Sequence, residues 1–270
     1  MTDKDILKMY PNNELEKLSL LDSLMKDWKG EISKAEPIIF YDDGKEYPPV
    51  DYFGSDGFLP NYFNQKQKVL FIGRETRYQS GGDLAVSLIN SFKTGKNINS
   101  NIWRRLIYIL YGIRNEGRLQ YENIPYADEI AKKMYESCDF GFSIMNMSKY
   151  SNDRDDGAKA DKELIQRFLK DSNLDKRNFI LEEIEILEPD IIITGNLWDG
   201  LIDEKFLKLC FPNLYLIKKI ENKANLYSTT INNRIIKLID LYHFSSRVSD
   251  KGRDPDNDYF YDPTMELLYK

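Results

Sequence analysis

Lys68-Val-Leu-Phe-Ile-Gly73 is a short apolar run with polar residues on both sides, and Arg74-Glu75-Thr76 follows it directly. A run of this length predicts a strand buried on both faces, as in a parallel sheet. Three later runs repeat the pattern, and the last of them ends at the only histidine of the chain. They are Phe140-Gly-Phe-Ser-Ile-Met-Asn146, Pro189-Asp-Ile-Ile-Ile-Thr-Gly195 and Ile235-Ile-Lys-Leu-Ile-Asp-Leu-Tyr-His243.

Helical patterns lie between these runs, which indicates a parallel sheet covered by helices. We therefore predict an α/β fold, a three-layer α/β/α sandwich around a central, mostly parallel four-stranded sheet, with a weaker strand at 214–217. Residues 1–64 are predicted to form an N-terminal helical and irregular extension packed on the core, and residues 65–270 the main domain. Arg104 and Arg105 are expected to face water. The helical patterns cover residues 100–112, 126–138, 158–171 and 175–187.

The composition excludes several classes of protein. Hydrophobic residues make up 41% of the 270 residues, enough for a sizeable core, and the net charge of −6 excludes a uniformly basic surface while leaving room for a local basic groove. Two isolated cysteines, Cys138 and Cys210, with one histidine predict no disulfide framework and no metal site. The charged N-terminus predicts no signal peptide, and no apolar run reaches the roughly 20 residues of a membrane helix. We expect a cytoplasmic protein without a membrane segment or cofactor.

Polar residues follow each predicted strand. Gly73-Arg74-Glu75-Thr76 follows the first, Asn146-Met-Ser-Lys149 ends the second, Gly195 ends the third, and His243-Phe-Ser-Ser-Arg247 follows the fourth. Because the carboxyl ends of parallel strands meet at one edge of a sheet, we expect these groups to converge on one crevice.

This ordered set resembles the uracil-DNA glycosylase superfamily over roughly residues 65–250. In that family a first motif of Gly, a variable residue, a polar or acidic residue and Pro shapes the uracil pocket, and its acidic residue positions the attacking water. Gly73 and Glu75 match that motif. The second motif is an Asn followed by "x-x-Lys", often with a later Arg, and its Asn reads the uracil edge. Asn146, Lys149 and Arg154 match it.

The third and fourth motifs complete the resemblance. Ile191-Ile-Ile-Thr-Gly195 matches the apolar strand that ends in Gly. The fourth motif is His-Pro-Ser or His-Pro-Ala, and its His stabilises charge on the departing uracil; His243 with Ser245 and Ser246 matches it. The iron–sulfur cluster that some members carry is predicted to be absent, because the cysteines it needs are missing.

Several positions depart from the family pattern. Thr76 and Phe244 stand where the first and fourth motifs have proline, and Arg74 stands where most members have a neutral side chain or Glu. Arg74 could form an ion pair with Glu75. Tyr78 is the candidate for the aromatic residue that stacks on the base.

The resemblance implies hydrolysis of an N-glycosidic bond in single- or double-stranded DNA, on a base turned out of the stack. The Asn146 amide offers one donor and one acceptor to the uracil edge. His243 would donate to the developing anion, and Glu75 would orient water. Gly73, Arg74, Tyr78 and Lys149 would complete the base pocket. The candidates for phosphate contacts are Arg154, Ser245, Ser246 and Arg247.

Each of these residues also has a structural interpretation. His243 is compatible with a structural histidine whose ring nitrogens are hydrogen-bonded within the protein. Glu75 is compatible with an ion pair to Arg74 or Arg77, and Asn146 with the cap of a turn. Lys149 and Arg154 are compatible with ordinary surface charges. The alternative function is a catalytically inactive protein of the same fold that binds a modified base, a nucleotide or a protein partner.

Overall fold

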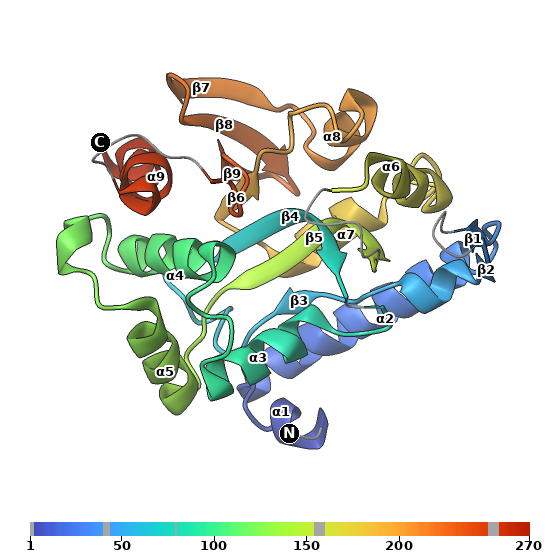
Figure 1. Ribbon diagram of the computed structural model, residues 1–270, viewed down its shortest axis with the longest axis horizontal. Coiled ribbons are helices and arrows are strands. Elements are labelled where there is room, and N and C mark those ends of the chain that lie inside the picture. Colours follow the sequence, from blue (N-terminus) through green and yellow to red (C-terminus); the bar gives the residue numbers. More distant parts are fainter. Residues whose placement is uncertain (1–2, 40–43, 79, 154–159, 248–253) are drawn as a thin grey trace.

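The computed structural model describes residues 3–39, 44–78, 80–153, 160–247 and 254–270, and its main feature is a seven-stranded sheet with the order β3-β5-β4-β6-β9-β8-β7 (Figure 1). A separate two-stranded ribbon joins β1 (Ile38–Ile39) to β2 (Glu46–Tyr47). The strands of the main sheet are β3 (Gly57–Phe58), β4 (Val69–Arg77), β5 (Ser143–Asn152), β6 (Ile191–Gly195), β7 (Tyr215–Ile220), β8 (Ala224–Ile231) and β9 (Arg234–Leu241).

The four predicted strands form the parallel centre of the sheet. β5, β4, β6 and β9 lie side by side and run in one direction. The α/β sandwich is confirmed, but the sheet has seven strands rather than four, because β3, β8 and β7 add antiparallel edges. β8 has no counterpart in the sequence prediction: its side chains alternate between buried and half-exposed along much of its length, so it lacks a continuous apolar run.

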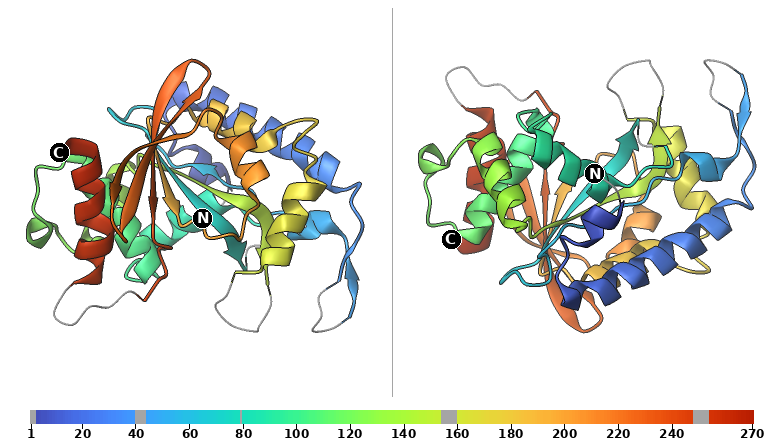
Figure 2. Two further views of the ribbon diagram at one scale, coloured as in Figure 1. Left: turned by 90° about the horizontal axis from the view of Figure 1, so that it is seen from above. Right: turned by 90° about the horizontal axis from the view of Figure 1, so that it is seen from below.

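Helices cover both faces of the sheet, as the two views of Figure 2 show. One group packs together from α3, α4, α5 and α9, and another from α2, α7 and α8, while α6 contacts β5. The helices are α1 (Asp3–Leu7), α2 (Leu15–Ile32), α3 (Leu84–Thr94), α4 (Asn101–Arg114), α5 (Ala127–Ser137), α6 (Lys162–Asp171), α7 (Phe179–Leu187), α8 (Glu204–Cys210) and α9 (Asp262–Tyr269).

The N-terminal 64 residues share the core of the rest of the chain. Trp28 on α2 is fully buried, stacks on Phe179 of α7 at 5.3 Å between ring centroids, and donates from its indole to the Ser172 hydroxyl at 2.9 Å. The same segment supplies β3, which pairs with β5. The predicted extension therefore packs on the core, and it also completes one edge of the sheet.

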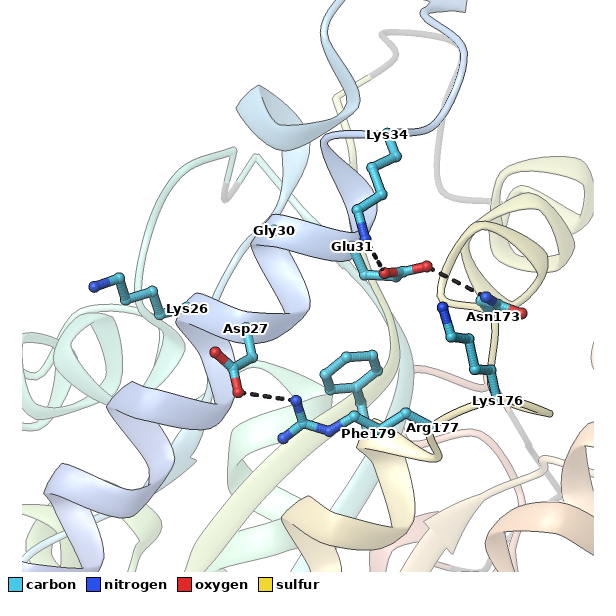
Figure 3. Close-up of a pocket in the computed structure, with 9 residues that line it drawn as sticks. All are labelled: Lys26, Asp27, Gly30, Glu31, Lys34, Asn173, Lys176, Arg177 and Phe179. Atoms are coloured by element: carbon cyan, nitrogen blue, oxygen red, sulfur yellow. Dashed lines mark hydrogen bonds and ion pairs between the residues drawn. The ribbon is translucent and has the colours of Figure 1, made fainter.

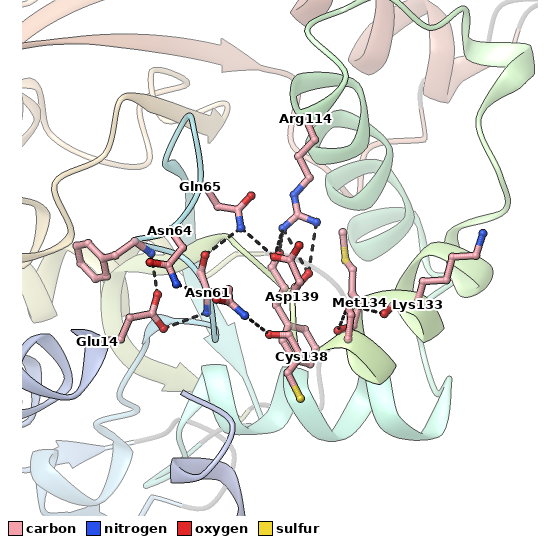
Figure 4. A network of polar contacts seen from close by, with 12 residues as sticks. Glu14, Asn61, Asn64, Gln65, Arg114, Lys133, Met134, Cys138 and Asp139 are labelled. Carbon is pink, nitrogen blue, oxygen red and sulfur yellow. Dashed lines mark hydrogen bonds and ion pairs between the residues drawn. The ribbon is translucent and has the colours of Figure 1, made fainter. Parts of the chain in front are cut away.

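A polar network fixes the chain where it enters β4 (Figure 4). Glu14, which is buried, accepts from the backbone N–H groups of Asn61 and Phe63 at 3.0 and 2.8 Å. Gln65 donates to Asp139 at 2.8 Å, and Arg114 of α4 binds the same carboxylate at 3.2 Å. This network joins α4 to the segments that precede β4 and β5, so both strands start from fixed positions.

No helix in the described ranges is long and apolar enough to cross a membrane.

Candidate active site

A pocket of about 590 Å³ opens at the carboxyl ends of the parallel strands. Residues of β4, of β5 and of the segment after β9 line it together. This edge of the sheet is where ligands bind in open α/β proteins. Apolar side chains form much of its wall: Phe71, Leu84, Ile102, Trp103, Leu106, Ile144 and Phe244. Seven of the residues predicted to act in catalysis or to bind substrate or DNA line it: Gly73, Arg74, Glu75, Tyr78, Asn146, His243 and Ser245.

The sheet register places Asn146 beside Gly73. The two residues are direct partners across β5 and β4, and a Cβ atom built on Gly73 would lie 2.4 Å from the Asn146 Oδ1. Glycine is thus required here because the amide occupies the space of a side chain. The Asn146 backbone N–H donates to buried Asp56 at 2.7 Å, while its side-chain amide has no hydrogen-bond partner among the described residues. The amide is therefore available to a ligand.

Glu75 combines a fixed oxygen with an unsatisfied one. Its Oε1 accepts from the Asn152 amide at 3.1 Å and from the Asp161 backbone N–H at 3.0 Å, just before α6. Its Oε2 is buried without a hydrogen-bond partner in the described part of the chain. Burial raises the pKa of Glu75 to about 7, against the lowering effect of these two hydrogen bonds. A carboxylate with these properties can take up a proton near neutral pH.

His243 lies just after β9 with a defined tautomer. The Ser245 backbone N–H donates to His243 Nδ1 at 3.3 Å, and the Ser245 hydroxyl lies 2.7 Å from the same nitrogen. Because a backbone N–H can only donate, Nδ1 is the acceptor and the neutral ring carries its proton on Nε2. Burial first, and the charge of Arg74 second, lower the pKa of His243 to about 4. His243 is thus a neutral hydrogen-bond donor at physiological pH.

Arg105 and Gly195 hold the His243 loop in the absence of the proline that the resemblance leads one to expect. Phe244 is buried and packs closely on Gly195: a Cβ atom built on Gly195 would lie 3.1 Å from the Phe244 ring. Arg105 donates to the carbonyls of Phe244 and Ser246, and to Asp256 at 2.7 Å. The prediction that Arg105 faces water is wrong: it is 3% exposed, because these acceptors compensate the burial of its charge.

Arg74 pairs with Asp199 rather than with Glu75. Its Nη2 lies 2.5 Å from the Asp199 carboxylate and 2.6 Å from the Asn196 carbonyl. The ion pair considered between Arg74 and Glu75 is therefore not formed, and Glu75 takes Asn152 and the Asp161 backbone instead.

Lys149 does not line the pocket, and the expectation that it binds substrate is corrected. It is fully buried and binds Asp56 at 2.6 Å, Glu183 of α7 at 2.7 Å and the Asn146 carbonyl at 3.1 Å. Although burial alone would lower the pKa of Lys149, the two carboxylates raise it. Lys149 therefore acts on the pocket indirectly, through Asp56 and the backbone of Asn146.

The remaining candidates lie at the rim or outside the described residues. Tyr78 lines the pocket with 62% of its surface exposed and a left-handed backbone (φ 53°), so it is an open rim residue. Ser246 lines a neighbouring cavity of about 540 Å³, and Arg247 is exposed. Arg154 falls outside the described residues.

Two further pocket residues had no predicted role in the site. Trp103 of α4 presents an aromatic side chain to the pocket, and Thr76 has a buried hydroxyl without a hydrogen-bond partner in the described ranges. Helical periodicity identified the α4 segment but not which of its residues faces the sheet edge, so the sequence carried no signal for Trp103.

Another cavity, of about 480 Å³, lies between α2 and the start of α7 (Figure 3). Its charged groups largely satisfy one another: Arg177 pairs with Asp27 at 2.8 Å and Lys34 with Glu31 at 2.5 Å. Within the described residues, no group of three or more His, Cys, Asp or Glu side chains could hold a metal ion. The sheet-edge pocket is therefore the better candidate for chemistry.

The fold and this pocket define an open α/β protein with a ligand site at the carboxyl ends of its parallel strands. A scan against protein-family models and searches of curated proteins and of solved structures find no match to this chain.

Proposed function

We propose that the protein is a DNA glycosylase-like hydrolase that cleaves the N-glycosidic bond of uracil or a related base. One observation carries the proposal: three groups line the same pocket, namely a neutral histidine donor, and an Asn amide and a carboxylate oxygen that have no hydrogen-bond partner among the residues that the structure describes. These are the three groups that the reaction needs, namely one to read the base, one to stabilise the leaving group and one to orient water.

In the proposed reaction the bond between C1′ of the sugar and N1 of the base breaks, and the electron pair leaves with the base. Asn146 pairs with the O4 and N3 edge of the base. His243 donates from Nε2 to O2, where negative charge develops. Glu75 orients a water molecule, and the oxygen of this water adds to C1′. The Glu75 carboxylate accepts the proton that the water loses. The products are the free base and an abasic site.

The direct test incubates the protein with single- and double-stranded oligonucleotides that carry one uracil, and measures abasic sites by alkaline cleavage. Uracil release by the wild type, and its loss in His243→Ala, would support the proposal. Binding of the oligonucleotide or of a nucleotide without any abasic product would instead favour a non-enzymatic role of the pocket.

The pH dependence should report Glu75. If Glu75 acts as a carboxylate, kcat/KM rises with pH up to about 7 and then levels off, because its pKa lies near 7. His243 is already neutral above about pH 4, so it adds no second limb between pH 5 and 9. Glu75→Gln should remove the dependence at a rate about a hundredfold lower. A wild-type rate that stays constant down to pH 5 would contradict this role.

Gly73→Ala tests the space that the Asn146 amide requires. The new methyl group would fall 2.4 Å from Oδ1, so the amide must move, and we expect kcat/KM to fall about 10- to 100-fold, largely through KM. Gly30→Ala is the matched control, because a Cβ at Gly30 meets nothing within 4 Å. An unchanged KM in Gly73→Ala would show that this contact does not position Asn146 for binding.

A further inference from the structure

We propose that Arg74 is a second charge-stabilising group of this pocket, whose guanidinium holds a fixed positive charge beside His243 where the departing base becomes negative. The inference rests on the proposed glycosylase function and adds a residue to its chemistry. It starts from a departure in the sequence, because Arg74 stands where the resemblance leads one to expect a neutral or acidic side chain.

The position of Arg74 suits this role. Arg74 and His243 both line the 590 Å³ pocket, and both also line the neighbouring 540 Å³ cavity that contains Ser245 and Ser246. Arg74 is 9% exposed, so water screens its charge little. The two side chains thus form a shared wall between the base pocket and the cavity beside it.

The guanidinium is held rigidly while one of its nitrogens stays available. Nε and Nη2 both donate to the Asn196 carbonyl, at 3.2 and 2.6 Å, and Nη2 also binds Asp199. Nη1 has no hydrogen-bond partner among the described residues. The guanidinium of this buried arginine is held in place through Nε and Nη2. The N–H groups of Nη1 can therefore donate to an anionic oxygen without any rearrangement of the side chain.

The Asn196 carbonyl that accepts from Arg74 is also held in a fixed position. Asn196 follows β6 in a turn that Asp240 of β9 secures, by accepting from the Thr194 hydroxyl at 2.5 Å and from the Leu197 backbone N–H at 3.1 Å. The carbonyl that holds Arg74 therefore belongs to the sheet edge itself. The Arg74 guanidinium is therefore held in a fixed position by the backbone at the edge of the sheet.

Arg74 supplies a charge that His243 does not. The charged groups that act on His243 are Arg74 on β4, Arg105 on α4 and Asp199 after β6; the two arginines disfavour the imidazolium and Asp199 favours it. Burial and the arginines together keep the ring neutral, so it offers only a hydrogen bond. Arg105 is committed to Asp256 and to the loop carbonyls. Of the cations that act on His243, Arg74 is thus the one that lines the pocket, while Arg77, which also lines it, acts on Glu75.

The kinetic test compares two leaving groups in the full-length protein. Fluorine at C5 makes 5-fluorouracil a better leaving group than uracil, so its release needs less help from a positive charge. In Arg74→Gln we expect the rate of uracil release to fall about 10- to 100-fold and that of 5-fluorouracil at most a few-fold. Arg74→Lys, which keeps the charge, should recover most of the difference. Equal losses for both bases in Arg74→Gln would overturn the proposal, because a merely structural role affects both alike.

The single histidine allows a second measurement that needs no turnover. Its ring proton signals in an NMR titration belong to His243 alone, and the pKa of about 4 should rise clearly in Arg74→Gln and little in Arg74→Lys. An unchanged pKa in Arg74→Gln would overturn the electrostatic contact. If the wild type releases neither base, the proposed function fails and the catalytic role of Arg74 falls with it. Release by the wild type with equal losses in Arg74→Gln overturns the Arg74 role alone.

Discussion

Asn146→Asp is expected to lower kcat/KM for uracil release by about three orders of magnitude. The substitution keeps the shape of the side chain but replaces the amide donor by a carboxylate oxygen, which would face the O4 acceptor of the base. A site built to form specific hydrogen bonds loses about 10⁴-fold or more when they cannot be made, and we expect somewhat less because the backbone contacts of the pocket remain. Steady-state kinetics on a uracil-containing oligonucleotide measure the loss.

Asn64→Asp is the charge-matched control, because Asn64 is exposed and does not line the pocket; it lies in the polar network before β4 (Figure 4). It should leave kcat/KM within about twofold. Thermal unfolding of Asn146→Asp should separate a loss of activity from a loss of stability. The hydrogen bond from the Asn146 backbone N–H to Asp56 does not involve the altered side chain. Comparable activity in Asn146→Asp and the wild type would refute the base-reading role of Asn146.

Lys149→Met is expected to lower the free energy of unfolding by about 3–5 kcal/mol. The reason is the charge left behind: Asp56 is 6% exposed, and its carboxylate would lose the ammonium group 2.6 Å away. Burial raises the pKa of Glu183 well above its usual range, and the nearby Asp56 carboxylate adds to this, so Glu183 can offset the loss of the ammonium group by taking up a proton. Urea unfolding at pH 7 gives the difference.

Two further variants separate this cause from the loss of a long side chain. Lys132→Met replaces an exposed lysine on α5 and should change stability by no more than about 0.5 kcal/mol. The double variant Lys149→Met/Asp56→Asn should recover part of the loss, because it removes the unpaired carboxylate as well. A loss below about 1 kcal/mol in Lys149→Met would mean that the buried ion pair is not needed for stability.

The parallel centre of the sheet could be predicted because each of its strands is buried on both faces and reads as an apolar run. The antiparallel edges were harder to predict. β7 is exposed along almost its whole length, and β8 alternates, so neither run carries a strong pattern of its own. α9 was not predicted either; its apolar residues pack against α4, which is distant in sequence.

Arg105 and Lys149 show why part of the site could not be predicted. Both are charged residues in ordinary sequence contexts, and a charged residue is expected at the surface unless a partner compensates its burial. The partners lie far along the chain: Asp256 and the Phe244 carbonyl for Arg105, and Asp56 and Glu183 for Lys149. Arg74 is a third example, because its partner is Asp199 and not the adjacent Glu75.

By itself the sequence determined the class of fold and the residues that end the central strands, because burial on two faces and the break of an apolar run are local properties of the chain. Only the tertiary structure decided which polar groups meet. It brought Asn146 against Gly73, left one oxygen of Glu75 without a hydrogen bond among the described residues, and gave His243 a neutral ring beside Arg74. Hydrogen bonds, desolvation and ion pairs depend on distances between segments that lie far apart in the sequence.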